Sequence, residues 1–287
     1  MNRKEQLIHH LKREMELRKY AQSSIGTYAS CLSVFLDAMK GKPAPLDIEH
    51  IKTFLLTIQN QNYHKQMVAA IHRFYEFVLQ QPLSLRDIPY PRPTNYLPNI
   101  LSIHETATMI GKIENLKHRA IIQLIYSCAM RIGELVKLKV CDIDSNRQLL
   151  KIVGAKGFKD RYVPIPQPTI MLLRTYYSKY KPTAWLFAGQ LPNEQYSVRS
   201  IQQVFYRACQ ASGIRKRVTP HSLRHSRLTH LKEAGVDIYE LKDIAGHSQI
   251  KTTEIYLHLA KQHLVDRVAM ADTILSQIST APLLRAC

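Results

Sequence analysis

A histidine and an arginine stand three residues apart at the expected start of a helix, within the run Thr219 to His225. Thr219 is suited to cap this helix, and Pro220 is suited to its first position. His221 and Arg224 would then share one face of the first turns. Because a helix N-terminus already favours anions, these side chains indicate a phosphate-binding site, and an ordinary capped helix with incidental polar residues is the alternative.

Other reactive side chains follow expected turns and helix ends. Arg131 and Glu134 would share a helix face, where a surface ion pair is the simpler interpretation. Lys156 lies between two glycines at an expected hairpin tip, where lysines are usually only solvated. His247 follows a glycine that we expect to end a helix, and Tyr256 comes nine residues later. Tyr256 could equally be a core aromatic residue, so each of these signals is weak by itself.

Metal and nucleotide chemistry find little support in the sequence. His221 and His225 are four residues apart, as in some zinc sites, but no third ligand is evident. A two-metal nuclease or transposase needs clustered carboxylates, for which Asp142, Asp144 and Asp160 are the local candidates. The chain has no GxxxxGK[ST] phosphate loop. We therefore expect no metal, nucleotide or other cofactor.

The composition points to a polyanionic partner. The 287 residues include 40 Lys plus Arg against 22 Asp plus Glu, a formal net charge of +18, which is more than solubility requires. The polar start, the short apolar stretch at residues 120–130 and the lack of a lipidation signal argue against a secretory route or a membrane partner. Five scattered cysteines without a CxxC pair favour a reducing compartment. We therefore expect nucleic acid as the partner and the cytoplasm as the location.

The first part of the chain carries apolar residues at three- and four-residue steps. They predict four helices within residues 1–88, forming one helical domain. Four prolines then fall within residues 89–98, and because proline disfavours helix and favours extended backbone, we expect a linker over residues 89–101. A long loop within a single domain is the alternative.

Helical patterns return in residues 102–287, interrupted by two short strand patterns at residues 148–153 and 161–165. A glycine-containing run, residues 154–160, separates the two strands and predicts a hairpin. The expected fold class is therefore mainly α. It combines an N-terminal four-helix domain with an α-rich second domain that contains a small antiparallel β-sheet.

Taken together, these residues occur in a known order. The strings RIGELVKLKVCDID, GAKGFKDRYVPI, HSLRHSRLTHL and AGHSQIKTTEIYLHL resemble the tyrosine recombinase (phage integrase) family in its compact, Xer-like two-domain form. SSIGTYASCLSVFLDAM and VAAIHRFYEFVL are similar to the family's core-binding, SAM-like DNA-binding domain, so the resemblance covers nearly the whole chain. It makes residues 102–287 the catalytic domain. The catalytic set that the resemblance implies is Arg131, Lys156, His221, Arg224, His247 and Tyr256.

The sequence departs from the family pattern at two places. Arg227 and Leu228 stand where the family usually has an aromatic and a small residue. Ala129 and Met130 replace the common Gly-Leu before the first arginine. Neither departure removes a catalytic group, although Arg227 must be packed differently from an aromatic ring.

The resemblance implies a reaction at one DNA phosphate. Arg131 and Arg224 would clamp the non-bridging oxygens, whose charge grows in the transition state. Tyr256 would attack phosphorus and form a 3′-phosphotyrosyl bond. Because a phenol has a pKa of about 10, Tyr256 needs the cationic cluster or a base such as His221 to lose its proton.

Three residues would support that step. Lys156 would protonate the departing 5′ oxygen as general acid. His247 would hydrogen-bond a non-bridging oxygen, and Glu134 would orient a neighbouring basic group. Because the covalent ester conserves the bond energy, strand exchange through a Holliday junction would need neither metal nor ATP.

The resemblance also implies partners and leaves alternatives open. The partners would be double-stranded DNA with specific recombination sites and three further copies of the chain in a homotetramer, in the cytoplasm at the bacterial nucleoid. The expected helix within residues 262–287, with its apolar stripe, would either pack on its own subunit or dock on a neighbour. A type IB-like topoisomerase and a catalytically inactive DNA-binding protein are the alternative functions.

Overall fold

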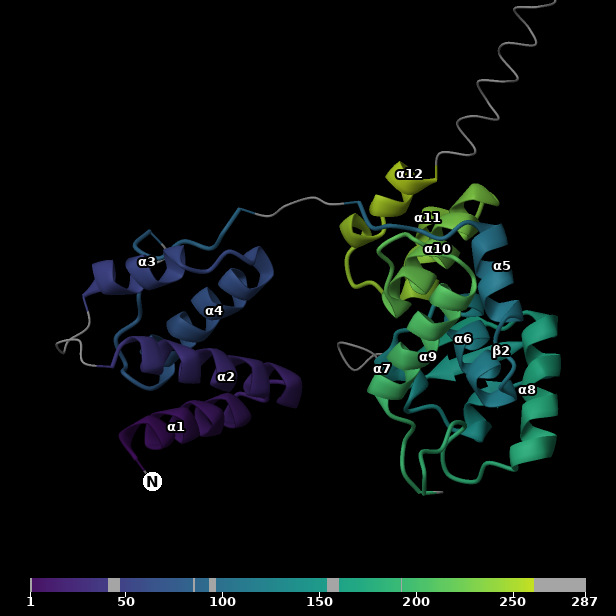
Figure 1. Cartoon of the computed structure of the whole chain (residues 1–287), viewed down its shortest axis with the longest axis horizontal. Helices are drawn as coiled ribbons and strands as arrows, with labels where there is room; N and C mark the ends of the chain where they lie inside the picture. The colour runs from purple at the N-terminus through teal and green to yellow at the C-terminus, as the bar shows by residue number, and fades with distance from the viewer. Residues whose placement is uncertain are drawn as a thin grey trace, which may run out of the picture. The chain divides into compact units, whose positions relative to one another are not determined.

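The computed structural model describes residues 2–40, 47–84, 86–92, 97–153, 160–191 and 193–260. The chain divides into two compact units, residues 1–95 and 96–287 (Figure 1). This division falls inside the stretch for which the proline pattern predicts a linker. The finer limits 1–88, 89–101 and 102–287 stay predictions.

The N-terminal unit consists of helices that bury one apolar face each. Side-chain caps begin three of them, because Asn2, Asp47 and Asn60 each accept a hydrogen bond from a backbone N–H of the first turn. Their apolar residues form one core that includes Leu32 and Phe35. The helices are α1 (Arg3–Leu17), α2 (Gln22–Ala38), α3 (Ile48–Leu56) and α4 (Gln61–Phe77).

The C-terminal unit is also mainly helical among its described residues. Its helices surround α6, whose side chains from Ala120 to Ile125 are almost all fully buried. Full burial of each large aliphatic side chain stabilises the fold by roughly 1.5–3 kcal/mol. The helices are α5 (Ile103–Gly111), α6 (Leu116–Ser127), α7 (Ile132–Leu135), α8 (Gln167–Tyr180), α9 (Val198–Ala211), α10 (Pro220–Glu233), α11 (Ile238–Ala245) and α12 (Ile255–Leu259).

One small sheet lies against these helices. Strands β1 (Ile143–Asp144), β2 (Leu149–Ile152) and β3 (Arg161–Pro164) pair in that order, and both pairings are antiparallel. Leu150 pairs with Val163, and both are buried in the core, so side chains alternate between core and solvent as the strand pattern predicts. The expected fold class, mainly α with a small antiparallel sheet, is confirmed.

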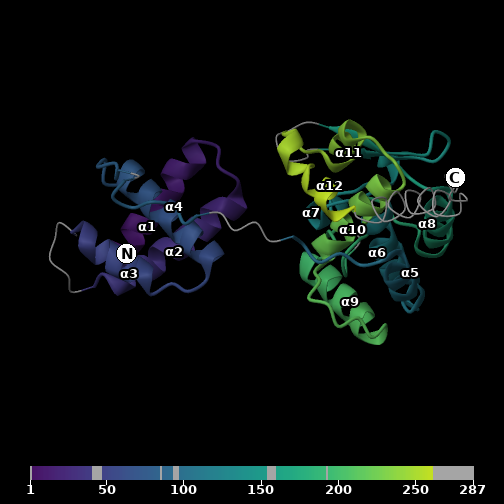
Figure 2. The same ribbon diagram turned by 90° about the horizontal axis from the view of Figure 1, so that it is seen from above.

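A second, smaller apolar cluster holds the last helices together. It comprises Ala129, Leu228, Leu241, Ala245 and Tyr256. Both views place α10, α11 and α12 beside one another (Figures 1 and 2). The segments that carry the reactive side chains therefore meet around this cluster. Among the described helices, none has the length and apolar character needed to cross a bilayer.

Candidate active site

The first arginine of the predicted set follows a tight turn at the end of α6. Ala129 has a φ of 47°, in the left-handed region that favours glycine, and it turns the chain so that Arg131 becomes the residue preceding α7. This conformation gives a physical reason for the glycine that the resembled family usually has there. The turn also directs the Ala129 carbonyl towards Arg224, whose Nη1 donates to it at 2.6 Å.

Glu134 is a buried carboxylate held between two guanidinium groups. Arg131 donates to it from Nη1 at 2.8 Å and from its backbone N–H at 2.9 Å. Arg161 on β3 donates to both carboxylate oxygens at 2.9 Å, as a fork. Burial alone would raise the pKa of Glu134, but the hydrogen bonds from Arg161 and Arg131 outweigh it and lower that pKa to about 2. Glu134 is therefore ionised and orients both arginines. The contact is buried, so it is not the surface ion pair that was the simpler interpretation of the sequence.

Arg224 on α10 exposes only 1% of its surface to solvent. In the described residues, no carboxylate is among its hydrogen-bond partners. Its donors reach the carbonyls of Ala129 and Ala245 and the ring nitrogen Nε2 of His247, the last at 3.1 Å. Burial, and then the charge of Arg131, lower the pKa of Arg224 to about 10. Arg224 is thus cationic at neutral pH, and partial dipoles are its main compensation, which favours an anion beside it.

His247 has one tautomer that fits its contacts. A guanidinium group can only donate, so Nε2 accepts from Arg224, and Nδ1 carries the proton that it donates to Thr253 Oγ1 at 3.0 Å. Burial, and then the charges of Arg224, Arg131 and Arg161, lower the pKa of His247 to about 4. His247 is therefore neutral near pH 7.

Tyr256 on α12 lies inside this cationic group with 1% of its surface exposed. Its ring is parallel to that of His247, with centroids 6.4 Å apart, and its hydroxyl lies 3.1 Å from Nδ1 of His225. Burial raises the pKa of Tyr256 to about 12, and the charges of Arg224 and Arg131 act in the opposite direction. The phenol is therefore protonated at neutral pH and sheltered from solvent.

The two histidines of α10 flank the phenol side of the site. His221 is exposed at the open edge, and its ring lies edge-on to that of His225 at 4.6 Å between centroids. Desolvation, and then the charges of Arg224 and Arg131, lower the pKa of His221. Burial, and then the neighbouring His221, Arg224 and His247, lower the pKa of His225 to about 4. Both shifts favour the neutral form of the ring in the protein without a bound anion.

The structure thus brings most of the predicted site residues together. Arg131, Glu134, Arg224, His247 and Tyr256 are linked by hydrogen bonds, ring contacts or electrostatic interaction, and His221 borders the same group. Lys156 and the expected helix within residues 262–287 lie outside the described residues.

Three contributing residues were not predicted from the sequence. Arg161 holds Glu134, Thr253 accepts from His247, and His225 contacts the phenol. Arg161 and Glu134 are 27 positions apart, so no local spacing points to their contact. In the sequence, His225 stood out only for its four-residue spacing from His221, which occurs in some zinc sites but came without a third ligand.

The carboxylates considered for metal binding have other contacts. Asp142 accepts from the backbone of Lys139, and Asp144 accepts from the turn that follows it. Asp160 lies 3.4 Å from Lys151 Nζ. Among the residues that the structure describes, no group of three His, Cys, Asp or Glu side chains is placed to hold a metal ion.

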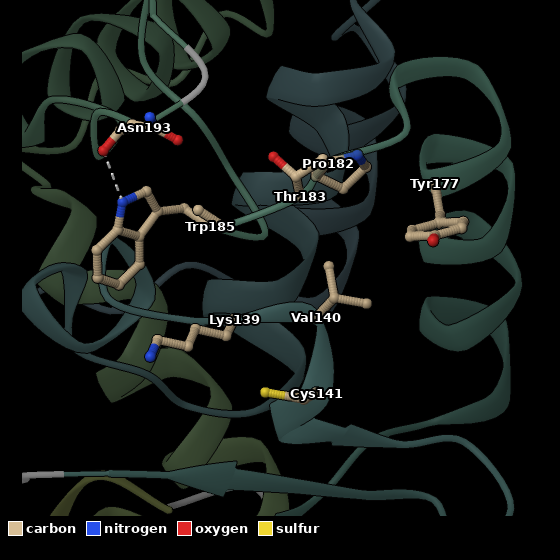
Figure 3. Close-up of a pocket in the computed structure, with 9 residues that line it drawn as sticks. Lys139, Val140, Cys141, Tyr177, Pro182, Thr183, Trp185 and Asn193 are labelled. Carbon is tan, nitrogen blue, oxygen red and sulfur yellow. Dashed lines mark hydrogen bonds between the residues drawn. The ribbon is translucent and has the colours of Figure 1, made fainter.

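An open cavity of about 920 Å³ lies elsewhere in the C-terminal unit (Figure 3). Trp185 borders it, with its indole N–H donating to the Asn193 carbonyl, and Lys139, Cys141 and Tyr177 also line it. The predicted catalytic residues are not among its lining residues. In the reactive group itself, Arg224 and Tyr256 are buried and the neighbouring His221 is exposed.

The fold and this site define a class of protein. The chain belongs to the phage integrase family, whose family model matches residues 95–263. The family's N-terminal SAM-like domain matches residues 7–85. The resemblance seen in the sequence is therefore confirmed, and the protein is an enzyme of the tyrosine-type site-specific recombinases and integrases.

Individual relatives agree with this assignment. The tyrosine recombinase XerD of Lacticaseibacillus casei is 32% identical over 281 residues, which cover 90% of this chain and 94% of that protein. A putative integrase/recombinase of Sinorhizobium fredii is 32% identical over 253 residues, covering 86% and 82%. Among solved structures, XerH site-specific recombinase bound to palindromic difH substrate, in a post-cleavage complex, has the same fold. Its TM-score is 0.73 at 22% identity, covering 89% of this chain and 82% of that one.

Proposed function

We propose that this recombinase cleaves and rejoins double-stranded DNA at specific sites through a 3′-phosphotyrosyl bond to Tyr256, and exchanges strands through a Holliday junction. The observation that carries this proposal is the enclosure of a buried phenol by a group of cationic and imidazole side chains drawn from distant segments. Such a group matches the needs of a phosphodiester, which carries a negative charge that repels nucleophiles and gains more in the transition state.

Arg131 and Arg224 are the residues suited to bind the scissile phosphate. Glu134 fixes the Arg131 guanidinium, and backbone carbonyls fix that of Arg224, so neither side chain has to be ordered when the substrate arrives. Both retain N–H donors for phosphate oxygens: within the described residues, Arg224 uses one hydrogen of Nη1 and both of Nη2, which leaves Nε–H and the second hydrogen of Nη1. Their positive charges would stabilise the additional negative charge that develops on the non-bridging oxygens.

His247 would assist at a third position. In the free protein its Nε2 accepts from Arg224, so it has no proton to offer a phosphate oxygen there. A bound phosphate would attract protons to the site and raise the pKa of His247, after which Nε2 could donate to a non-bridging oxygen. Lys156 is proposed from the family resemblance alone as the acid that protonates the leaving 5′ oxygen.

The partners follow from the same chemistry. The net charge of +18 favours binding to the DNA backbone, and the XerH relative is bound to its difH substrate. We propose specific recombination sites, a homotetramer on DNA, docking of residues 262–287 on a neighbouring subunit, and action in the cytoplasm. Neither metal nor ATP would be required.

Covalent trapping tests the proposal and identifies the target sequence in the same experiment. Purified protein is incubated with fragmented genomic DNA of its source, the reaction is stopped with detergent, and DNA bound to protein is sequenced from its attached 3′ ends. We expect one recurring sequence at these ends for the natural protein and none for Tyr256→Phe. Failure of the natural protein to exceed Tyr256→Phe, with DNA binding intact, would indicate a binding protein without catalysis.

Plasmid relaxation separates the remaining alternative. A supercoiled plasmid that lacks the recovered sequence should stay supercoiled with this protein. Relaxation of that plasmid at the same rate as one carrying the sequence would instead indicate a topoisomerase.

A further inference from the structure

The proton of Tyr256 has a partner that the sequence did not indicate. The phenol hydroxyl lies 3.1 Å from Nδ1 of His225, and the two ring centroids are 5.8 Å apart. His221, which the sequence suggested as the base, instead lies beyond His225 at the exposed edge and contacts it ring to ring. Among the residues that the structure describes, His225 is therefore the one within hydrogen-bond reach of the Tyr256 hydroxyl.

We propose that His225 is the general base of DNA cleavage, accepting the Tyr256 proton on Nδ1 as the phenol oxygen attacks phosphorus. A base has to lie within about 2.6–3.2 Å of the proton-bearing atom, and His225 already satisfies this condition in the free protein. This role deepens the proposed function, because it presupposes that Tyr256 is the nucleophile.

The proposed role requires that Tyr256 donates its proton to Nδ1 of His225. The pKa of His225 is about 4, so the ring is neutral near pH 7 and one of its nitrogens carries no proton. The phenol is protonated at that pH because its own pKa is about 12. Nδ1 of His225 is the hydrogen-bond partner that the described residues give the Tyr256 hydroxyl, so in the proposed arrangement the phenol donates to a bare Nδ1 and Nε2 carries the ring proton.

The same surroundings keep the pair inactive without DNA. Transfer of a proton from a phenol with a pKa of about 12 to an imidazole with a pKa of about 4 is strongly unfavourable. The positive charge of Arg224 contributes to this unfavourable transfer, because it disfavours the protonated form of His225. A phosphate bound between Arg131 and Arg224 would neutralise part of that charge and raise the basicity of His225. Nucleophile activation would thereby depend on substrate binding.

The step balances in atoms and charge. The Tyr256 O–H bond breaks and its proton goes to His225 Nδ1, while an oxygen electron pair forms the bond to phosphorus. The bond from phosphorus to the 5′ oxygen breaks, and that oxygen leaves with the electron pair and takes a proton from the general acid. In the rejoining step the 5′ oxygen attacks, and His225 returns its proton to Tyr256.

A sulfur leaving group separates this role from that of the acid. The probe is a nicked duplex with the cleavage sequence recovered by covalent trapping, made with oxygen or with sulfur as the bridging 5′ atom. A sulfur leaving group needs no protonation, so cleavage by Lys156→Ala should recover on the sulfur substrate. We expect His225→Asn, which keeps an acceptor but cannot take a proton, to cleave both substrates about 100-fold or more slowly in single turnover.

The pH profile supplies a readout that a purely structural role would not change. The groups that face His225 are His221 and Arg224 on α10, His247 after α11 and Tyr256 on α12. Cleavage by the natural protein should fall on acidification as His225 becomes protonated. His225→Asn should instead show a rate that rises with pH across the range, since hydroxide has to take the proton. The same experiment with His221→Asn should retain the acid limb.

Several outcomes would overturn this role. One is a cleavage rate of His225→Asn within a few-fold of the natural rate, and another is recovery of that variant's cleavage on the sulfur substrate. A third is faster cleavage by His225→Asn, which would mean that His225 restrains Tyr256. If the natural protein itself forms no adduct, the proposed function fails instead. Nitrogen-15 NMR of the unmodified protein tests the geometry without DNA or substitution: Nδ1 of His225 should carry no proton, and a protonated Nδ1 would contradict the assignment.

Discussion

The two units of this protein differ in where their charged side chains lie. In the N-terminal unit, the ion pairs are exposed and mostly local, as in Lys52 with Glu49 and Arg73 with Glu76. Such pairs contribute little to stability, so this unit is stabilised mainly by its apolar core. In the C-terminal unit, Glu134 and Arg224 are buried, and their contacts join segments far apart in the sequence.

This difference shows what the active site costs the fold. Burying ionised groups requires compensation by hydrogen bonds, and for Arg224 that compensation comes from carbonyls and an imidazole. An anion beside Arg131 and Arg224 would add charge compensation that carbonyl dipoles supply only in part. The C-terminal unit should therefore be the more sensitive of the two to pH, to loss of a partner and to small shifts in its turns.

Acidification should show the largest difference. His225 and His247 have pKa values of about 4 in the fold against an ordinary value of 6.5, so the unfolded chain binds their protons first. Above pH 6.5 these histidines are neutral in both the folded and the unfolded chain, and as the pH falls from 6.5 towards 4 the free energy of unfolding decreases. Each histidine should lower the free energy of unfolding by about 3 kcal/mol over this range, which makes roughly 6 kcal/mol if the two are independent.

Two probes can follow the units separately in the intact chain. The single tryptophan, Trp185, lies in the C-terminal unit, and its fluorescence reports urea unfolding of that unit at each pH. Hydrogen exchange of α2 and α4 reports the N-terminal unit. Equal loss of stability in both units between pH 6.5 and 4 would contradict the comparison.

Substitution of the buried arginine should have the next largest effect, on catalysis. Arg224→Lys keeps the charge but loses the planar fork that reaches Ala129, Ala245 and His247. We expect single-turnover cleavage to fall about 1,000-fold, or about 4 kcal/mol of transition-state stabilisation. Arg119→Lys is the matched control, since Arg119 also donates to a carbonyl, that of Ile113, outside the site. Similar decreases in the cleavage rate for both variants would contradict a specific role of Arg224 in catalysis.

Much of the fold follows from local signals in the sequence. The Thr219 and Pro220 pair predicts the start of α10, and the structure begins that helix at Pro220. The strand patterns predict β2 and β3, because alternating burial leaves a signal at a period of two residues. Such features depend on neighbours a few positions away, and for that reason they can be read without coordinates.

The partners within the site could not be predicted in the same way. Glu134 and Arg131 are close in sequence, but the fork that buries Glu134 comes from Arg161 on a strand 27 positions away. His225 and Tyr256 are 31 positions apart, and their contact depends on how α12 packs on α10. The family resemblance supplied the candidate residues, whereas the structure shows which atoms these residues contact.

Removal of the buried Glu134 carboxylate should lower the free energy of unfolding more than removal of an exposed carboxylate does. Glu134→Gln leaves Arg131 and Arg161 without their shared anion, and we expect a loss of about 3 kcal/mol in the free energy of unfolding, measured by Trp185 fluorescence in urea. Glu76→Gln removes the exposed partner of Arg73 and should cost less than about 1 kcal/mol, measured by hydrogen exchange of α4. Comparable losses would mean that Glu134 is no better coupled than a surface residue.

The smallest effect tests the turn that supports Arg161. Gly246 has a φ of +60°, and a Cβ there would lie 2.9 Å from Nη1 and 3.0 Å from Cζ of Arg161. Gly213 has a similar φ of +68° but nothing within 4 Å of the same position, so Gly213→Ala measures backbone strain alone, about 1–2 kcal/mol. Gly246→Ala should show that strain and, because Arg161 has to shift against Glu134, a decrease in cleavage of about tenfold. If both variants cleave DNA equally well, Arg161 does not position the site through Glu134, and the sensitivity of the C-terminal unit to its turns would be disproved.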